Sequence, residues 1–217
     1  MVSQSDLTLE GIRAALAPSL VRDAAFDGWT LAAVESAARS SRINPATARI
    51  AFADGAMDMI AAWIADIDRR MAEALPAELL ATFSVRERIR RLVTFRLEAV
   101  AEQRESLRRA LAIMAMPQNL ARTAKIGWHS ADIMWRLAGD AAADFNHYTK
   151  RATLAGIYAA TLAVLVDDKS EGLAETRAFL DRRIAGIMRF EKAKAQLLSR
   201  EHFSPSRFLG RLRYPAR

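Results

Sequence analysis

The sequence predicts an all-helical protein. Apolar residues recur at three- and four-residue spacing along most of the chain, and helix-capping residues precede these apolar runs. No segment alternates convincingly between apolar and polar residues, as a half-buried strand does. Hydrophobic residues make up 52% of the 217 residues, which is enough for a sizeable core. We therefore expect one large helical domain or a domain with a small appendage.

Three short helices are expected at the N-terminal end. The first covers residues 6–17 and is expected to stop near Pro18. Thr30 is a suitable N-cap for the second helix. Asn44 caps the third, and Pro45 occupies its first position, where the missing N–H costs nothing.

Longer helices are expected to follow. Asp54 is the expected N-cap of the fourth helix, and Ser84 forms a capping box with Glu87 at the start of the fifth. A sixth covers residues 105–114, and the seventh is expected to end at Gly139, since glycine often follows a helix C-terminus.

Two further helices complete the expected fold. Asp144 caps the eighth, and Gly172 precedes the ninth. The longest apolar stretch, residues 152–166, lies in the eighth helix and is shorter than the ~20 residues needed to span a bilayer. We therefore interpret it as a core helix. The N-terminal residues show no secretory signal pattern, and the absence of cysteine fits a reducing cytoplasm, so we expect a cytoplasmic protein.

Basic charge is concentrated at the C-terminal end. Residues 182–217 contain ten basic and two acidic residues, a net charge of +8, whereas five arginines and six acidic residues give residues 1–54 a net charge of −1. A basic end with interleaved aromatic residues suits an anionic membrane surface or nucleic acid, and a solvated tail is the open alternative.

The first four expected helices have the short, short, turn, short, long layout of the TetR repressors, whose helix-turn-helix reads DNA. The candidate recognition helix, residues 45–52, offers Thr47 and Arg49 as polar contacts. Phosphate contacts dominate DNA affinity, and the net charge of −1 over residues 1–54 opposes them. We therefore expect no nucleic-acid binding, with a TetR-type repressor responding to an apolar effector as the alternative function.

Patterns of common catalytic and metal sites are absent from the sequence. All nine glycines are isolated, so neither GxGxxG nor a P-loop is present. None of the three histidines lies in HExxH or in a Glu-x-x-His pair, and there is no GxSxG. With no cysteine, disulfides and thiolate metal sites are impossible. We predict no catalytic residue, no metal and no enzyme, although an irregular active site remains a third possibility.

A distinctive set of motifs lies in the second half of the chain. Residues 134–135 read MW, residues 138–140 read AGD, residues 144–152 read DFNHYTKRA and residues 179–182 read FLDR. This set resembles the ninth Coq family, the lipid-binding accessory proteins of coenzyme Q (ubiquinone) biosynthesis. The family commonly has Trp where this chain has His147, which is smaller and more polar.

The resemblance implies a TetR-like, commonly dimeric fold that has given up DNA binding. It implies an apolar tunnel that holds a phospholipid or an isoprenoid quinone precursor, with no cofactor. It also implies a surface that docks the di-iron demethoxyubiquinone hydroxylase, and a C-terminal helix that meets the inner face of the cytoplasmic membrane. The corresponding regions are a helix-turn-helix-like part (1–54), a lipid-binding helical domain (55–198) and a basic amphipathic tail (199–217).

The resemblance also suggests site residues. The expected lipid-binding residues are Tyr148, Ala152, Ala155, Gly156 and Ala159. The expected partner-binding residues are Asp132, Met134, Asp140, His147, Tyr148 and Arg151. The expected membrane-binding residues are Arg207, Phe208, Arg211 and Arg213. From the residue types alone, the small residues also suit close helix packing, Met134 also suits the core, and the charged residues also suit local pairing.

Overall fold

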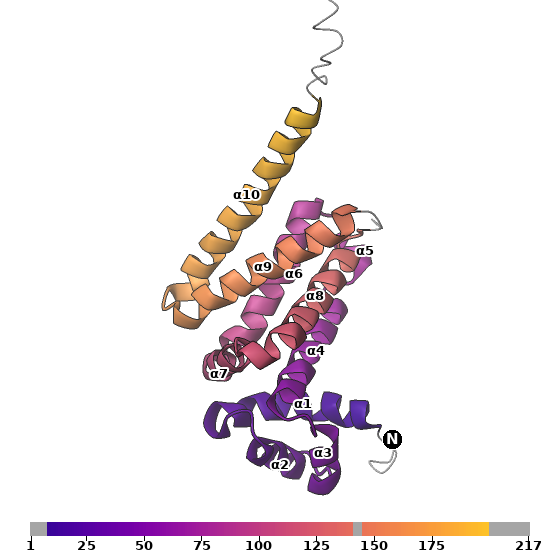
Figure 1. Cartoon of the computed structure of the whole chain (residues 1–217), viewed down its shortest axis with the longest axis vertical. Helices are drawn as coiled ribbons and strands as arrows, with labels where there is room; N and C mark the ends of the chain where they lie inside the picture. Colours follow the sequence, from indigo (N-terminus) through magenta and orange to yellow (C-terminus); the bar gives the residue numbers. More distant parts are fainter. Residues whose placement is uncertain (1–7, 141–144, 200–217) are drawn as a thin grey trace, which may run out of the picture. The chain divides into compact units, whose positions relative to one another are not determined.

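The computed structural model describes residues 8–140 and 145–199, and within these ranges its secondary structure is entirely helical (Figure 1). The all-α class predicted from the sequence is confirmed. The chain divides into two compact units, residues 1–180 and 181–217. The core, the candidate site and the contacts described below all belong to the first unit.

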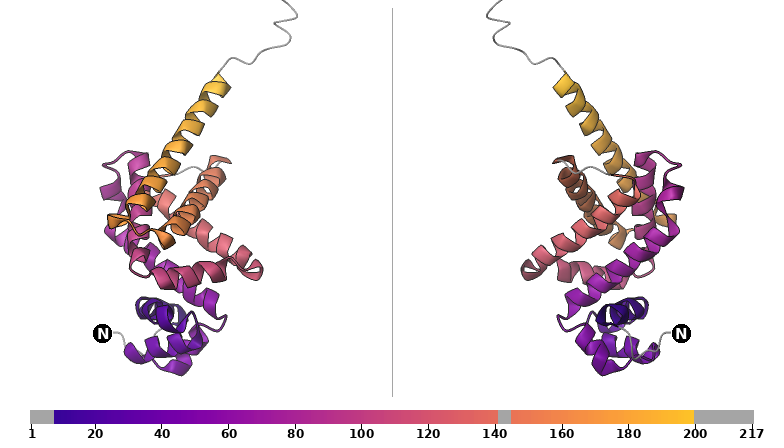
Figure 2. Two further views of the ribbon diagram at one scale, coloured as in Figure 1. Left: turned by 90° about the vertical axis from the view of Figure 1, so that its left-hand side faces the viewer. Right: turned by 90° about the vertical axis from the view of Figure 1, so that its right-hand side faces the viewer.

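Three N-terminal helices form one end of this unit (Figure 2). They are α1 (Leu9–Asp27), α2 (Leu31–Ser40) and α3 (Pro45–Ala51). The prediction that the first helix stops near Pro18 was wrong, because α1 continues through this proline. Leu16, Ala17 and Leu20 on either side are completely buried, and this packing outweighs the backbone hydrogen bond that proline removes.

The turn between α2 and α3 follows the predicted capping chemistry. The Asn44 side chain accepts a hydrogen bond of 2.8 Å from the Ala46 N–H, and Pro45 is the first residue of α3. Thr30 occupies the N-cap position of α2, but its hydroxyl donates to the Asp27 carbonyl instead of accepting from the helix. Local sequence therefore placed both helix starts correctly.

Longer helices build the rest of the first unit, together with shorter elements. They are α4 (Ala56–Ala74), α5 (Ala77–Leu80), α6 (Val85–Ala101), α7 (Arg104–Met114), the 3-10 helix η2 (Pro117–Asn119), α8 (Leu120–Leu137), α9 (Phe145–Asp167), the 3-10 helix η3 (Glu171–Leu173) and α10 (Ala174–Ser199), which continues into the second unit. None of the described helices is both long and apolar enough to cross a membrane.

Two predicted caps of these helices have different outcomes. Ser84 accepts a hydrogen bond from the Glu87 N–H at the start of α6, as predicted. Asp54 is not the cap of α4, because Gly55 takes that position. The Asp54 N–H instead donates to the Asp58 carboxylate one turn later. The predicted cap Asp144 lies outside the described residues.

Gly139 ends α8 as predicted and turns the chain toward α9. Its φ of +86° lies in the left-handed region that favours glycine, and the following Asp140 N–H donates to the Trp135 carbonyl at 2.9 Å. Arg88 of α6 donates to the Ala138 carbonyl at 2.9 Å, and a Cβ on Gly139 would approach its guanidinium to 3.1 Å. The turn therefore holds Asp140 in a fixed place beside α8.

A pair of tryptophans joins the N-terminal helices to the larger bundle. Trp29, just before α2, and Trp63 of α4 are both buried, with ring centroids 5.5 Å apart. The Trp29 indole N–H donates to the Ser106 carbonyl of α7 at 3.0 Å. The N-terminal helices thus share one core with α4 and α7.

Candidate functional site

A cavity of about 420 Å³ lies among α4, α6, α7, α8 and α9. Most of its lining side chains are apolar. The lining residues are Ile60, Trp63, Ile64, Ile67, Arg96, Val100, Leu107, Leu111, Met114, Ala115, Leu120, Thr123, Ala124, Ile126, Gly127, Ser130, Ala155, Gly156, Tyr158, Ala159 and Leu162. This volume lies in the ~300–1,000 Å³ range of small-molecule sites, which are also mostly apolar.

The cavity combines a buried wall with an exposed rim. Ile60, Ile67 and Val100 are buried, whereas Leu120 and Gly156 are exposed to solvent. A Cβ added to Gly156 or to Gly127 would meet no atom within 4 Å. These two glycines therefore leave open space. The sequence left close helix packing as an alternative role for the small residues, and the structure does not show such packing at Gly156.

The structure brings together three of the five residues predicted to bind lipid. Ala155, Gly156 and Ala159 line the cavity. Ala152 is exposed and lies outside the cavity, and so does Tyr148, which is 60% exposed. Ala152 and Tyr148 precede Ala155, the first lining residue of α9, so the cavity ends before it reaches them.

One end of the cavity carries a polar cluster that sequence analysis missed. Arg96 is 1% exposed, and its Nη1 donates to Asp68. The Ser130 hydroxyl donates to the same carboxylate at 2.9 Å, and the Tyr158 ring lies 4.8 Å from the guanidinium carbon. These residues come from four helices. The sequence signal was a charged residue within the apolar face of α6, since Arg96 follows Val93 at helical spacing.

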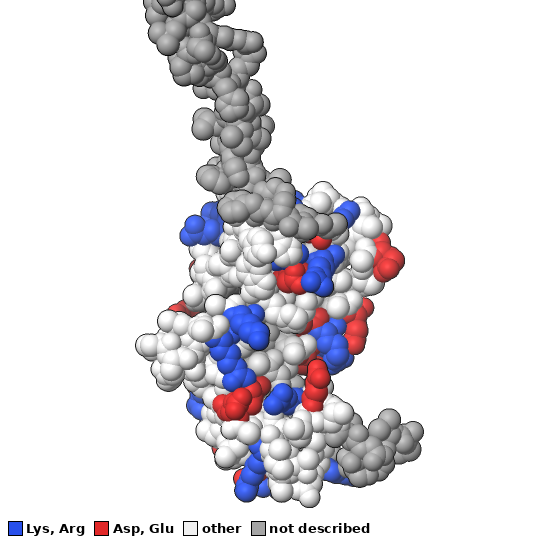
Figure 3. Space-filling view, turned by 45° about the vertical axis from the view of Figure 1, so that its right-hand side comes forward, with Lys and Arg blue, Asp and Glu red and all other residues white. Residues whose placement is uncertain are grey.

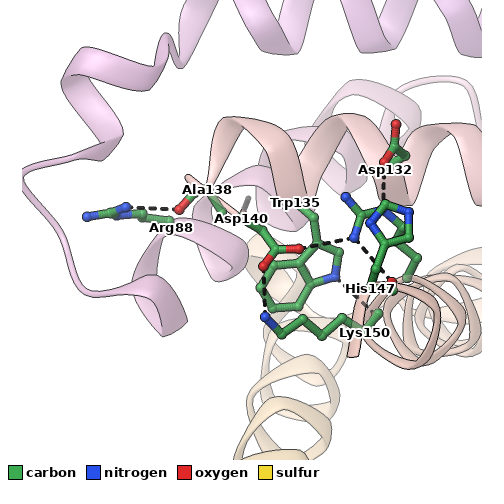
Figure 4. A network of polar contacts seen from close by, with 8 residues as sticks. Arg88, Asp132, Trp135, Ala138, Asp140, His147 and Lys150 are labelled. Atoms are coloured by element: carbon green, nitrogen blue, oxygen red, sulfur yellow. Dashed lines mark hydrogen bonds and ion pairs between the residues drawn. The ribbon is translucent and has the colours of Figure 1, made fainter. Parts of the chain in front are cut away.

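A second polar group, the junction network, joins the end of α8 to the start of α9 (Figure 4). It consists of Asp132, Asp140, Lys150 and Arg151. Arg151 donates to Asp132 at 2.6 Å and to Asp140 at 3.0 Å, and Lys150 donates to Asp140 at 2.7 Å. Burial alone would raise the pKa of Asp140, but hydrogen bonds from Lys150 and Arg151 outweigh it and lower that pKa. The carboxylate therefore stays ionised and holds the two helices together.

An aromatic cluster lies on the surface beside the junction network. It consists of Trp128 of α8 and His147 and Tyr148 of α9. The Tyr148 ring centroid is 5.9 Å from that of Trp128 and 5.2 Å from that of His147. Tyr148 is 60% exposed, and the other two are partly exposed. Trp128 was missed from the sequence, where it lies 19 residues from His147 and outside the quoted motifs.

The residues predicted to bind a partner divide between surface and interior. His147 and Tyr148 reach the surface. Met134 is completely buried and Arg151 is 1% exposed, so the prediction that these two present side chains to a partner needs correction. Met134 faces inward because it belongs to the apolar face of α8, and Arg151 because its guanidinium is enclosed by the junction network. Asp132 and Asp140 are mostly buried in that network.

The remaining predictions from the sequence concern DNA, metal and membrane binding. Arg49, the basic residue of α3, forms an ion pair with Glu35 of α2. On the face drawn in Figure 3, basic and acidic side chains are interspersed. Among the described residues there is no group of three metal-ligating side chains. The predicted membrane-binding residues Arg207, Phe208, Arg211 and Arg213 lie outside the described part of the chain.

Comparisons with known proteins agree with this architecture. Residues 120–191, which include the junction network and the aromatic cluster, match the COQ9 family. The resemblance to the COQ9 family is confirmed. The chain is 33% identical to the rat protein named "Ubiquinone biosynthesis protein COQ9, mitochondrial" over 79% of its length, and 31% identical to the human COQ9 over the same share. The chain covers 57% and 56% of these relatives, little more than half of their length.

A solved structure shows the same fold. The TetR transcriptional regulator from Nitrosomonas europaea superposes with a TM-score of 0.63, covering 80% of this chain and 96% of the regulator. Their sequence identity is 23%, so the similarity concerns the fold alone. The TetR-like fold predicted from the helix layout is confirmed.

The predicted location was wrong. We expected a cytoplasmic protein at the inner face of the cytoplasmic membrane, but the rat, bovine and human COQ9 relatives are named mitochondrial proteins. The expectation rested on the absence of cysteine and of a secretory signal pattern, and neither observation distinguishes these compartments.

Proposed function

We propose that this protein acts in ubiquinone biosynthesis as an accessory protein that binds a polyprenyl-quinone intermediate and presents it to the demethoxyubiquinone hydroxylase. The observation that carries the proposal is the largely apolar cavity, in a chain whose COQ9 relatives are named for ubiquinone biosynthesis. A TetR-type repressor is the weaker alternative, since the fold supports it but Arg49 is already paired with Glu35.

The lining suits an isoprenoid chain. Transfer of apolar surface from water into an apolar cavity is favourable, and Ile60, Ile67 and Val100 provide such a wall. The exposed rim at Leu120 and Gly156 gives a long chain a way out of a cavity that is smaller than a complete polyprenyl tail. We infer that the cavity holds one end of the lipid while the remainder extends through the rim.

The aromatic cluster is the proposed docking surface for the hydroxylase. Exposed aromatic side chains are typical interface anchors, and Tyr148 is the most exposed member. The neighbouring junction network fixes the start of α9, because Arg151 also donates to the His147 carbonyl at 3.1 Å. The anchors are therefore held on a rigid support before a partner binds, which lowers the entropy lost on docking.

A titration with a ubiquinone that carries a short isoprenoid chain tests the cavity. Quinones quench tryptophan fluorescence on contact, and Trp63 lines the cavity. Gly156→Leu places a side chain in the open space at the rim and should weaken quinone binding by about tenfold or more. Ala160→Leu is the matched control, because Ala160 is exposed on the same helix and does not line the cavity.

The control should keep wild-type affinity, and both variants should unfold at the wild-type temperature or above. Equal quinone binding by wild type and folded Gly156→Leu would reject the cavity as the lipid site. No binding by wild type would reject the proposed function itself.

A further inference from the structure

Arg96 presents an unusual arrangement for the wall of an apolar cavity. Its side chain lines the cavity, is 1% exposed and pairs with Asp68 through Nη1. The Nε atom is also buried, and it has no hydrogen-bond partner among the described residues. A buried donor without an acceptor is unfavourable and uncommon in folded proteins. Because Nε is enclosed, the Arg96 side chain must shift slightly before a ligand atom in the cavity can accept this hydrogen bond and remove the penalty.

The charges of the cluster restrict the kind of acceptor. Arg96 and Asp68 form a buried ion pair of zero net charge, and Ser130 donates to the same carboxylate. A carboxylate or phosphate entering here would add a negative charge in an apolar surrounding, close to Asp68, and would lose its hydration. An uncharged carbonyl or ether oxygen accepts a hydrogen bond without that cost.

The position of the cluster sets the direction of the ligand. Arg122 of α8 pairs with Asp58 of α4, and Ser130 pairs with Asp68, so the two helices run in the same direction. Leu120, at the exposed rim, and Ser130 are ten residues apart on α8, which corresponds to about 15 Å at the rise of an α-helix. The polar group therefore lies at the far end of the cavity from Leu120.

We propose that Arg96 is the head-group donor of this cavity. Its Nε–H binds an uncharged ring oxygen of a quinone-type lipid, and the isoprenoid chain runs toward the rim at Leu120. The cavity then selects quinone lipids over both hydrocarbons and lipid anions. This assignment rests on the proposed lipid-binding function and adds the chemistry of the head group.

A double variant tests the selection without leaving a buried charge unpaired. Arg96→Met combined with Asp68→Asn removes both charges, and Asn keeps an acceptor for the Ser130 hydroxyl. Replacement of a complete buried ion pair is commonly tolerated, whereas removal of one partner is not. The probes are a ubiquinone with one isoprene unit, the hydrocarbon farnesene and the anion palmitate, each titrated against the full chain.

Wild type should bind the quinone at least about tenfold more tightly than farnesene or palmitate, and the double variant should reduce its preference over farnesene to about threefold or less. Equal affinity of wild type for quinone and farnesene, tighter binding of palmitate, or an unchanged preference in the folded double variant would overturn the head-group assignment. If wild type bound none of the three probes, the proposed lipid-binding function would fall as well.

A second measurement follows the donor itself in wild type and needs a variant only to assign its resonance. NMR spectra of ¹⁵N-labelled protein contain a resonance for each arginine Nε–H. The resonance that is present in wild type and missing from Arg96→Lys belongs to this donor. Saturating quinone should move it downfield, as expected when a free N–H gains an acceptor, and farnesene should not. An unmoved resonance in the presence of bound quinone would overturn the assignment.

Discussion

The cavity and the junction network are both built on α8 and α9, yet they differ in how they are assembled. The cavity takes its wall from five helices, between Ile60 and Leu162. The junction network lies within a short segment, from Asp132 to Arg151, and its charges pair with one another. The difference separates two roles: the cavity leaves space for a ligand, whereas the network uses its polar groups to fix the support of the aromatic cluster.

The largest effect is expected from Arg151→Met in the junction network. This change leaves Asp132 and Asp140 without their shared buried guanidinium, and breaking a buried ion pair costs about 3 kcal/mol or more of unfolding free energy. Urea unfolding measures this loss. Lys150→Met is the control, because Lys150 is partly exposed and its loss should cost about 1 kcal/mol or less. Equal losses in both variants would show that the network is not the support we describe.

Tyr148→Asp should affect the partner and leave the fold intact. Tyr148 is 60% exposed, so its replacement should leave the melting temperature nearly unchanged. If it is an interface anchor, hydroxylase binding should weaken by about 2 kcal/mol, or roughly thirtyfold. Binding measured with purified hydroxylase tests this, and cells carrying the variant should accumulate demethoxyubiquinone. Unchanged hydroxylase binding and normal coenzyme Q levels with the folded variant would exclude the docking role.

A third buried polar group, the Asp168 carboxylate, directly follows the C-terminal end of α9. Unlike the cavity and the aromatic cluster, it is expected to affect stability alone. Burial alone would raise its pKa, but hydrogen bonds from the N–H and hydroxyl groups of Ser170 and Thr176 outweigh burial and hold the pKa far below its ordinary value. Its ionised form therefore stabilises the folded state above about pH 4, near the pKa of unfolded Asp, and this contribution is lost as pH falls further.

Asp168→Asn measures that contribution. The variant should be less stable than wild type at pH 7, and its unfolding free energy should fall less steeply between pH 5 and pH 2.5. Quinone affinity at pH 7 should stay unchanged, since Asp168 does not line the cavity. Parallel pH profiles for the two proteins would contradict the depressed pKa of Asp168.

The smallest effect is expected from Ala152→Leu. The family resemblance placed Ala152 among the lipid-binding residues, whereas the structure leaves it exposed and outside the cavity. Quinone affinity should therefore stay within about twofold of wild type, in contrast to Gly156→Leu one turn later. A loss similar to that of Gly156→Leu would show that the cavity extends along α9 toward Tyr148.

The sequence predicted several features that depend on neighbouring residues, but not all of them, since Gly55 and not Asp54 caps α4. Asn44, Ser84 and Gly139 act through nearby backbone groups, so their roles were readable from spacing. Pro18 was misjudged because packing from other helices keeps α1 intact, which no local rule contains.

The residues of the candidate site were harder to predict from the sequence, because their burial and pairing also depend on packing between helices. The central motif located the end of α8 and the start of α9, but it did not distinguish the exposed Tyr148 from the buried Met134. The polar end of the cavity was missed altogether, because Asp68, Arg96 and Ser130 meet only when α4, α6 and α8 pack together. Burial and pairing across helices are properties of the folded chain.

The central claim is that the cavity is the lipid site, and lipid that co-purifies with the protein tests it most directly. Native mass spectrometry of wild type should show a bound isoprenoid quinone or a precursor of one. Gly127→Leu, which fills open space in the cavity wall, should lose that lipid, and the exposed-site control Ala160→Leu should retain it. Wild type purified without any bound lipid, or the same lipid retained by folded Gly127→Leu, would contradict the account.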